Sequence, residues 1–280
     1  MNIEETINKA ANILRDHKIK NPYLDCEILL SESLKKDRKY IILNSKENLK
    51  DKSIEIFNSL IEQRKKGKPI AYLIKKKEFW NYEFYVDDNV LIPRPDTELI
   101  IDQLLNIYPK NSRLNILDIG TGSGCILLSL LKERPNSYGI GIDVCSKSIN
   151  VSKYNAKLLK LTNKVKFFNS DVDNFKNGKY DVVVSNPPYI EFKNLKYLER
   201  DVFNFEPKLA LNGGLDGFSK FRKIIKRTNF LIKKNGKLIL EIGYNQKNKV
   251  KKILEENGFY INKMLKDYGG NDRCIISTKI

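Results

Sequence analysis

The first part of the chain carries apolar residues at helical spacing. They recur three or four positions apart, as on one face of a helix: Ile3, Ile7, Ala10, Ala11 and Leu14. A second helix is predicted to start at Asn21-Pro22, because asparagine suits a cap and proline suits the first turn. Ile54, Phe57, Leu60 and Ile61 continue the spacing. We therefore expect residues 1–75 to form a small helical bundle.

The pattern then changes to aromatic and β-branched residues. Between Phe79 and Ile92 such residues surround Asp87-Asp88-Asn89, which predicts a β-hairpin and makes 76–92 a linker. Asp96 follows at a position where it would cap a helix that carries Leu99.

From residue 111 onward, predicted strands and helices alternate. Alternation of this kind is typical of a doubly wound α/β sheet, and it sets the third domain as 93–280. The last two strands follow each other closely, which predicts an antiparallel edge. The expected strands are 114–119, 138–142, 165–168, 180–185, 237–242, 259–265 and 274–277, and the expected helices are 125–131, 146–161, 217–233 and 245–257.

A glycine-rich turn joins the first of these strands to its helix. Glycine permits positive φ and lets a ligand approach the backbone, and here the turn reads Gly120-Thr121-Gly122-Ser123-Gly124. The next strand ends in Asp143, about 20 residues later, where a carboxylate can bind ribose hydroxyls. The spacing is not that of a dinucleotide site, so S-adenosylmethionine is the better ligand. Asp171, after the third strand, is placed to accept from the adenine amine; a solvated loop carboxylate is the alternative.

The most informative motif is Asn186-Pro187-Pro188-Tyr189, at the end of the strand Val182-Val183-Val184-Ser185. A planar NH2 group is a poor nucleophile until its hydrogens are held and its plane is fixed. The Asn186 side-chain oxygen and the Asn186-Pro187 backbone carbonyl can accept those hydrogens, while the prolines stiffen the loop. Tyr189 offers a ring face to the target. Catalysis would consist mainly of positioning, and the alternative is an ordinary strand-ending turn.

Composition sets the outer limits. Four scattered cysteines indicate neither a disulfide framework nor a metal site, and we expect a reduced, cytoplasmic protein that does not span a membrane and is monomeric. The single histidine, His17, is expected on the surface. The net charge of +17 favours an anionic partner. Biased base composition explains the dispersed lysines equally well, so direct nucleic-acid binding stays open.

The motifs together resemble one family, the release-factor glutamine methyltransferases. The likeness extends from about residue 69 onward and rests on an ordered set of stretches: Glu78-Phe79-Trp80, Leu91-Ile92-Pro93-Arg94-Pro95-Asp96-Thr97-Glu98, Leu117 to Ile126, Val184 to Ile190, Glu206-Pro207, Ala210-Leu211, Gly213-Gly214, Asp216-Gly217 and Glu241-Ile242-Gly243.

The resemblance implies a Rossmann-like class I S-adenosylmethionine-dependent methyltransferase domain. The substrate would be the glutamine of the Gly-Gly-Gln loop of class I peptide chain release factors, methylated on its side-chain nitrogen to tune translation termination, with the N-terminal bundle helping to dock the release factor. Position by position, Gly120 to Gly124 would line the methionine end of the cofactor, Asp143 would hold the ribose, and Asp171 and Val172 would border the adenine. Asn186 to Tyr189 would hold the target amide, and Asn186 would also contact the cofactor.

Two positions depart from the family pattern, which usually has glycine at Lys75 and tryptophan at Val172. Lys75 makes the linker turn uncertain, and Val172 removes a large ring from the adenine edge. Phe79 and Trp80 are read as hairpin core, with the target pocket as the alternative, and Arg94, Glu206 and Glu241 receive no role. The nearest rival is a nucleic-acid adenine or guanine N-methyltransferase, and the rival of another class is a non-catalytic RNA-binding or ribosome-binding protein.

Overall fold

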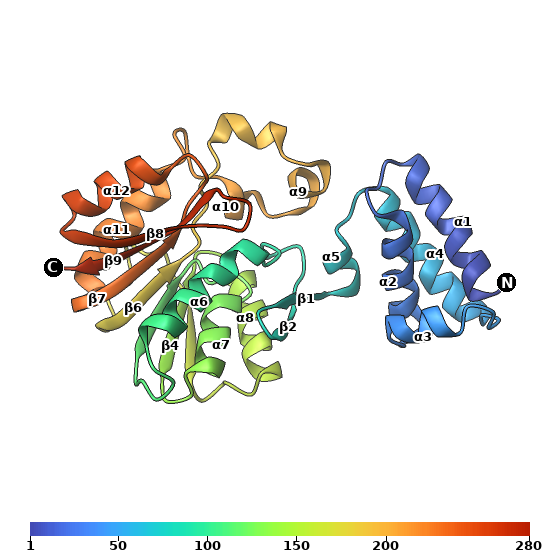
Figure 1. Ribbon diagram of the computed structural model, residues 1–280, viewed down its shortest axis with the longest axis horizontal. Coiled ribbons are helices and arrows are strands. Elements are labelled where there is room, and N and C mark those ends of the chain that lie inside the picture. Colours follow the sequence, from blue (N-terminus) through green and yellow to red (C-terminus); the bar gives the residue numbers. More distant parts are fainter. The chain divides into compact units, whose positions relative to one another are not determined.

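The computed structural model describes all 280 residues, which divide into two compact units (Figure 1). The first unit comprises Met1–Lys76 together with Glu199–Phe205, and the second comprises Lys77–Leu198 with Glu206–Ile280. The short segment Glu199–Phe205 therefore belongs to the N-terminal unit although it lies far along the chain. No periodicity in the sequence indicated that this segment belongs to the N-terminal unit.

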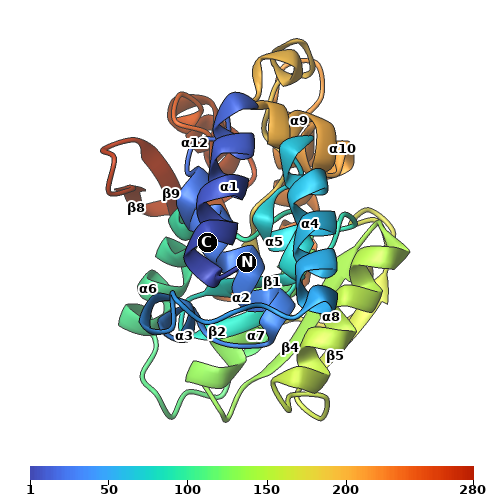
Figure 2. The ribbon, with the colours of Figure 1, turned by 90° about the vertical axis from the view of Figure 1, so that its right-hand side faces the viewer.

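The first unit is helical, as the apolar spacing predicted. Helices α1, α2 and α4 pack as neighbours (Figures 1 and 2) around a shared apolar core that includes Leu14, Leu30 and Phe57. Asn2 begins α1 with a capping box: its side chain accepts from the Glu5 backbone N–H at 2.9 Å, and Glu5 accepts from the Asn2 N–H at 3.2 Å. The helices are α1 Ile3–Asp16, α2 Pro22–Leu34, α3 Arg38–Leu43, α4 Asp51–Lys65, α5 Ile70–Ile74 and α9 Arg200–Phe205.

The start of α2 differs in detail from the prediction. Pro22 occupies the first turn as expected, but the Asn21 side chain makes no capping hydrogen bond. A buried ion pair joins α2 to α4 instead. The Arg64 Nε donates to Asp25 Oδ2 at 2.7 Å, and Arg64 Nη1 donates to the Lys68 carbonyl at 3.0 Å. The guanidinium thus satisfies two acceptors at once.

The hairpin forms earlier in the chain than predicted. Strands β1 Lys76–Phe79 and β2 Tyr82–Tyr85 pair across a two-residue turn at Trp80-Asn81, so placing the turn at Asp87-Asp88-Asn89 was wrong. The register follows from packing, because Phe79 and Phe84 are both buried, with ring centroids 6.2 Å apart. Trp80 adopts φ 56°, and its backbone N–H donates to Glu98 while its indole N–H donates to Glu133. The core interpretation of Phe79 and Trp80 is therefore confirmed.

Asp96 does not cap the following helix. A short 3₁₀ turn, Pro95–Thr97, precedes α6 Glu98–Ile107, and Thr97 is the residue at the α6 N-cap position. The Asp96 carboxylate instead lies 3.4 Å from a side-chain nitrogen of Arg273, which belongs to the last strand in the chain. A charge partner distant in sequence therefore replaces the local capping contact that the pattern suggested.

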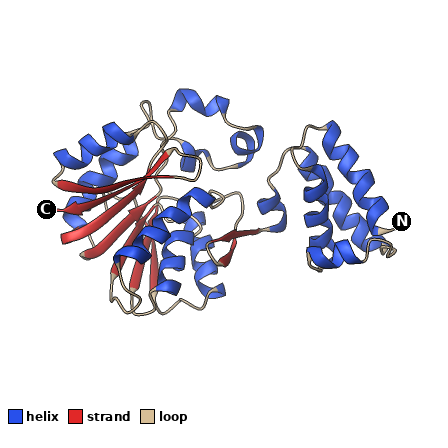
Figure 3. Ribbon diagram, in the orientation of Figure 1, coloured by secondary structure: helices blue, strands red, loops and turns tan.

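The second unit contains a seven-stranded sheet in the order β5-β4-β3-β6-β7-β9-β8. Its strands are drawn in red in Figure 3. Its first five strands pair in parallel and the last two are antiparallel, which confirms the predicted doubly wound fold and its antiparallel edge. The strands are β3 Asn115–Ile119, β4 Tyr138–Asp143, β5 Val165–Asn169, β6 Tyr180–Ser185, β7 Ile232–Glu241, β8 Phe259–Lys266 and β9 Asp272–Lys279.

Helices cover both faces of this sheet (Figure 1). Successive strand residues point to opposite faces, so Ile116 packs with α6, α7 and α8, while Leu117 packs with α11 and α12. Because both faces are buried, the strands read as continuous apolar runs. The remaining elements are α7 Cys125–Glu133, α8 Ser146–Leu158, the 3₁₀ helix Phe192–Tyr197, α10 Lys208–Leu211, α11 Ser219–Leu231 and α12 Lys247–Glu256. None of the helices combines the length and apolarity that crossing a bilayer requires.

Candidate active site

A cavity of about 420 Å³ opens in the second unit where the parallel strands end, a size typical of small-molecule sites. Residues that directly follow or end four neighbouring strands line it: Gly120 after β3, Asp143 at the end of β4, Ser170 after β5 and Asn186 after β6. Ligands of open α/β sheets bind at this edge. The topology therefore gathers the two predicted motifs around one space.

The glycine turn lines one side of the cavity with backbone. Gly120, Gly122 and Gly124 have φ values of 75°, 54° and 81°, which favour glycine. A Cβ on Gly120 would meet nothing within 4 Å, whereas one on Gly124 would lie 3.0 Å from Leu128 Cδ1. Gly124 is absent from the cavity lining. The first two glycines thus leave the backbone open to a ligand, and the third permits close packing of α7.

Asp143 holds the turn in place while facing the cavity. Its Oδ2 accepts from the Gly122 N–H at 3.0 Å and its Oδ1 from the Cys145 N–H at 2.9 Å. Burial raises the pKa of the Asp143 carboxyl above its usual value, opposed by these backbone hydrogen bonds. Each carboxylate oxygen keeps a further lone pair that a ligand hydroxyl can use.

Asp171 and Val172, which follow β5, also line the cavity. Asp171 Oδ1 accepts from the Asp173 N–H at 2.9 Å, and the Lys223 Nζ lies 3.7 Å from its Oδ2. Val172 is buried within the apolar cluster under α11. Ile142 and Ile224 line the cavity as well, so its lining offers both apolar contacts and a carboxylate to a flat apolar group with one polar edge.

Asn186, Pro187 and Pro188 form a second wall of the cavity that the glycine turn also lines. The Asn186 Nδ2 donates to Thr97 Oγ1 at 3.1 Å, and Thr97 Oγ1 donates to Glu241 Oε2 at 2.6 Å. Both Thr97 and Glu241 are buried. Asn186 therefore has one end of its amide committed to the protein.

Tyr189 lies elsewhere than its predicted place beside the target. It is not among the residues that line the cavity, and its ring packs against the apolar cluster under α11 and α12. Its hydroxyl donates to Glu241 Oε1 at 3.4 Å and accepts from Arg273 Nη1 at 3.5 Å. Burial, reinforced by the Glu241 charge, raises the pKa of the Tyr189 phenol, which keeps it protonated.

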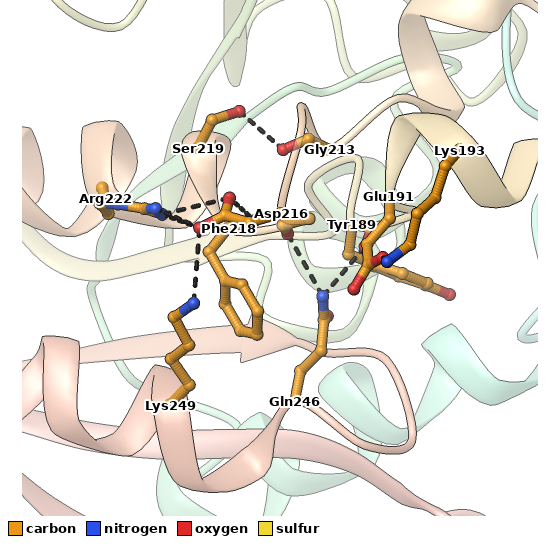
Figure 4. A network of polar contacts seen from close by, with 11 residues as sticks. Tyr189, Glu191, Lys193, Gly213, Asp216, Phe218, Ser219, Arg222, Gln246 and Lys249 are labelled. Carbon is orange, nitrogen blue, oxygen red and sulfur yellow. Dashed lines mark hydrogen bonds and ion pairs between the residues drawn. The ribbon is translucent and has the colours of Figure 1, made fainter.

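The backbone of Tyr189 is clamped by a polar network (Figure 4). Gln246 Nε2 donates to the Tyr189 carbonyl at 2.9 Å and to the Gly217 carbonyl at 3.2 Å, while its Oε1 accepts from the Gly243 N–H at 3.0 Å. A Cβ added at Gly213 would lie 2.8 Å from the Tyr189 Cα and carbonyl carbon. The Asn-Pro-Pro wall is thus fixed from behind by backbone contacts that tolerate no extra atom.

An ion pair fixes one of the charged residues of the cavity lining. Arg94 lines the cavity and forms an ion pair with the buried Glu206, which also accepts from the Ile92 N–H at 3.3 Å. Arg94 lies between Pro93 and Pro95, and the Glu206 carboxylate holds its guanidinium. No cluster of three or more potential metal ligands occurs in the chain.

Comparison with known proteins places the chain in a family. Residues 5–74 match the family model described as PrmC N-terminal domain, and residues 96–206 match Methyltransferase small domain. The release factor glutamine methyltransferase of Buchnera aphidicola subsp. Acyrthosiphon pisum is 38% identical over 279 residues, covering 100% of this chain and 99% of that protein. The release factor glutamine methyltransferase of Clostridium acetobutylicum is 36% identical over 282 residues, covering 100% and 99%.

This chain belongs to the release factor glutamine methyltransferase family. The resemblance seen in its motifs is thereby confirmed. Among solved structures, a methyltransferase from Pyrococcus furiosus aligns with a TM-score of 0.54 and 19% identity, covering 80% of this chain and 98% of that one. That likeness supports the fold alone.

The cofactor of this methyltransferase is S-adenosylmethionine, and the cavity fits such a ligand. A Cβ built on Gly120 would extend into open space, so the turn offers a cradle of unobstructed backbone. The lining contains the carboxylates of Asp143, at the end of β4, and Asp171, after β5, together with apolar residues such as Ile142 and Val172. A molecule with a ribose, an adenine and an amino-acid tail presents both polar and apolar groups to such a lining.

The two departures from the family pattern have visible consequences. Lys75 ends α5 in the left-handed conformation, with φ 56°, where glycine carries no steric penalty. The chain therefore keeps the turn despite the lysine. Val172 still lines the cavity but presents a small aliphatic surface where a ring would present a broad one.

Sequence reasoning left several site residues without a role. Thr97 and Glu241 lie far from Asn186 in the chain and reach it only through the fold. Glu241 carried a usable signal, since it ends the apolar strand Leu238-Ile239-Leu240 as Asp143 ends its own strand. Gln246 carried none, because a glutamine at the start of a helix is unremarkable in sequence.

Proposed function

We propose that this enzyme transfers a methyl group to the side-chain amide nitrogen of a glutamine in the Gly-Gly-Gln loop of class I peptide chain release factors. The observation that supports it is the cavity that joins the Gly120–Ser123 backbone to the Asn186-Pro187-Pro188 wall, in a chain of this family. The reaction tunes translation termination in the cytoplasm.

S-adenosylmethionine supplies an electrophilic methyl group on a sulfonium. The Gly120, Thr121, Gly122 and Ser123 backbone would hold its amino-acid end, Asp143 the ribose and Asp171 with Val172 the adenine. Gly124 would support the turn from behind, as its packing against Leu128 indicates.

Asn186 and Pro187 would hold the target. The Asn186 Oδ1 and the backbone carbonyl between Asn186 and Pro187 accept the two amide hydrogens, which fixes the plane of the NH2 group and directs its nitrogen at the methyl group. The nitrogen forms a bond to carbon as the carbon–sulfur bond breaks, and one amide proton leaves to solvent. Pro188 would pack on the amide, and Tyr189 would anchor the loop through its clamped carbonyl.

The decisive experiment incubates the full chain with labelled S-adenosylmethionine and a release factor, followed by mass spectrometry of the loop peptide. We expect one methyl group on the loop glutamine and none on a Gln→Ala release factor. Label that goes to DNA or RNA in preference would support the base N-methyltransferase, and an absence of S-adenosylmethionine binding by calorimetry would support a non-catalytic binding protein.

Replacing Asn186 tests the target wall. Asn186→Ala removes an acceptor that the proposal uses only for the target, so we expect kcat to fall about 100-fold while the Kd for S-adenosylmethionine changes little. Single-turnover kinetics and calorimetric titration give the two quantities. If Asn186→Ala instead weakened S-adenosylmethionine binding and kept the wild-type kcat, Asn186 would bind the cofactor and not the target.

The N-terminal unit is proposed to dock the release factor, in line with its match to the family's N-terminal domain model. Removal of residues 1–75 would then raise the KM for release factor far more than the Kd for S-adenosylmethionine. A truncated chain that is still folded by circular dichroism and keeps its KM would contradict this role.

A further inference from the structure

Three polar side chains from three separate elements form a chain that ends in the cavity. Glu241 ends β7, Thr97 lies in the 3₁₀ turn before α6, and Asn186 follows β6. The hydrogen bonds measure 2.6 Å from Thr97 Oγ1 to Glu241 Oε2 and 3.1 Å from Asn186 Nδ2 to Thr97 Oγ1. Glu241 and Thr97 are only 2% and 3% exposed, so water does not compete for these bonds.

The chain has one consistent direction. An ionised carboxylate has no hydrogen and acts only as an acceptor, so the single hydroxyl hydrogen of Thr97 goes to Glu241. The Thr97 oxygen then has lone pairs alone to offer, and it can face only a donor. The donor end of the Asn186 amide, Nδ2, must therefore point at Thr97, which turns Oδ1 away from it.

We propose that Glu241, acting through Thr97, determines which end of the Asn186 carboxamide faces the target, and so makes Asn186 an acceptor there. This inference rests on the proposed function, because an NH2 target requires an acceptor. Glu241 and Thr97 are positioning residues: neither needs to touch the transferred methyl group. An amide in the reverse orientation would present N–H groups to the N–H groups of the target.

A nearly isosteric change at Glu241 should alter the direction of these hydrogen bonds. In Glu241→Gln the new amide can donate to Thr97 Oγ1, which frees the Thr97 hydrogen to point at Asn186. Asn186 then gains by turning its Oδ1 toward Thr97 and its Nδ2 toward the target. A substitution that retains shape would thus reverse the polarity of the site.

A compensating change can restore the acceptor. In the double variant Asn186→Asp with Glu241→Gln, the amide introduced at position 241 donates to Thr97. The Thr97 hydroxyl then donates to one carboxylate oxygen at position 186, and the other oxygen faces the target. The pair again contains one carboxylate. Asn186→Asp alone places two carboxylates on the single Thr97 hydroxyl hydrogen, so only one of them can accept it.

Titration of Glu241 should act in the same direction. Burial raises the pKa of Glu241 to about 7, opposed by the Thr97 hydrogen bond and the Arg273 charge. A protonated Glu241 has a hydrogen of its own to give to Thr97, so the preference for one amide orientation weakens as the pH falls through this range. The groups that face Glu241 from the surrounding elements are Asp96, Thr97, Cys125, Tyr189, Arg273 and Cys274.

The test measures kcat and S-adenosylmethionine Kd for variants of the full chain. We expect Glu241→Gln to lower kcat about 100-fold, and the double variant to exceed both single variants by about 10-fold. Thr97→Val should lower kcat, and Thr97→Ser should recover most of that loss. Glu133→Gln is the matched control, since Glu133 accepts from Trp80 and Tyr82 outside the cavity, and it should keep the wild-type rate.

The pH profile is the second readout. The wild-type rate should fall as pH decreases through about 7, and this step should be absent from Glu241→Gln. A double variant no faster than the slower single variant, with melting temperatures and cofactor Kd values retained, would overturn the polarity role. Failure of wild-type enzyme to methylate the loop glutamine would instead refute the proposed function, so the two failures are distinct.

Discussion

The glycine turn at Gly120–Ser123 and the wall at Asn186–Pro188 face the same cavity, but different kinds of contact hold them in place. The turn depends on backbone conformation, with positive φ at Gly120 and Gly122 and one carboxylate bracing it. The wall depends on side chains that arrive from other elements, such as Thr97, Glu241 and Gln246. Backbone conformation is enough to shape the turn around a ligand. The wall must also present a hydrogen-bond acceptor in one direction, and this requires side chains that hold Asn186 in one orientation.

The largest effect is expected at the back of the wall. An alanine at Gly213 would place its Cβ 2.8 Å from the Tyr189 backbone, and no flexible side chain can give way there. The wall must shift, so Gly213→Ala should lower kcat about 100-fold with little change in S-adenosylmethionine Kd. The control is Gly269→Ala, whose Cβ would meet only side-chain atoms at 3.2 Å or beyond. If Gly213→Ala raised the Kd for S-adenosylmethionine by the same factor by which it lowered kcat, the two walls would not be independent.

The matching change on the other wall is Asp143→Asn. Asp143 accepts from two backbone N–H groups, and an amide can accept from only one of them while its NH2 opposes the other. We expect the Kd for S-adenosylmethionine to rise about 10- to 100-fold, with the saturated kcat much less affected. Asp173→Asn, outside the cavity lining, serves as the control. A fall in kcat with Kd intact would break the proposed division of labour.

A pH experiment probes the support beneath the turn. Asp118 is buried, its Oδ2 accepts from Thr121 Oγ1 at 2.7 Å, and its Oδ1 has no partner. Burial raises the pKa of Asp118 from 3.8 to about 7, so the folded state favours the protonated form. This contribution to stability is present in full below about pH 4 and is lost as pH rises toward 7, by up to about 4 kcal/mol.

Denaturant titrations between pH 4 and 8 should therefore show the second unit losing stability as pH rises, and Asp118→Asn should flatten that slope. Burial also raises the pKa of Glu241 to about 7, so Glu241 contributes in the same direction. The double variant Asp118→Asn with Glu241→Gln should therefore flatten the slope further. A slope unchanged by both substitutions would show that neither carboxyl is protonated in the fold.

The smallest effect is expected at Lys75, which lies outside both cavity walls. Lys75 occupies the left-handed region at φ 56°, so Lys75→Gly should raise the free energy of unfolding by about 1 kcal/mol. Glu55→Gly, at an exposed position inside α4, should lower it by roughly the same amount. Both stabilities come from urea titration. Both positions lie outside the cavity lining. A change in stability alone should leave the glycine turn and the Asn186–Pro188 wall in place, so neither variant should change kcat or the cofactor Kd by more than a few tenths of its value.

Much of this protein was determined by local pattern. Strands buried on both faces appear as apolar runs such as Val182-Val183-Val184, and the spacing of Gly120, Gly122 and Gly124 marks a turn, because backbone conformation depends on neighbours in the chain. Elements, fold class and the two cavity motifs were therefore predictable, and the order of motifs indicated the family. The hairpin turn was misplaced because Trp80 takes a positive φ that only Glu98 and Glu133 explain.

Only the tertiary structure decided how those motifs are oriented. Asp96 serves Arg273 and not a helix end, Tyr189 turns from the cavity to the core, and Asn186 receives its polarity from Thr97, 89 positions away in sequence, and from Glu241 beyond it. The physical reason is that a hydrogen bond depends on direction as well as residue type. A sequence shows which side chains can donate or accept, but only the folded chain settles which of them meet and which way each hydrogen points.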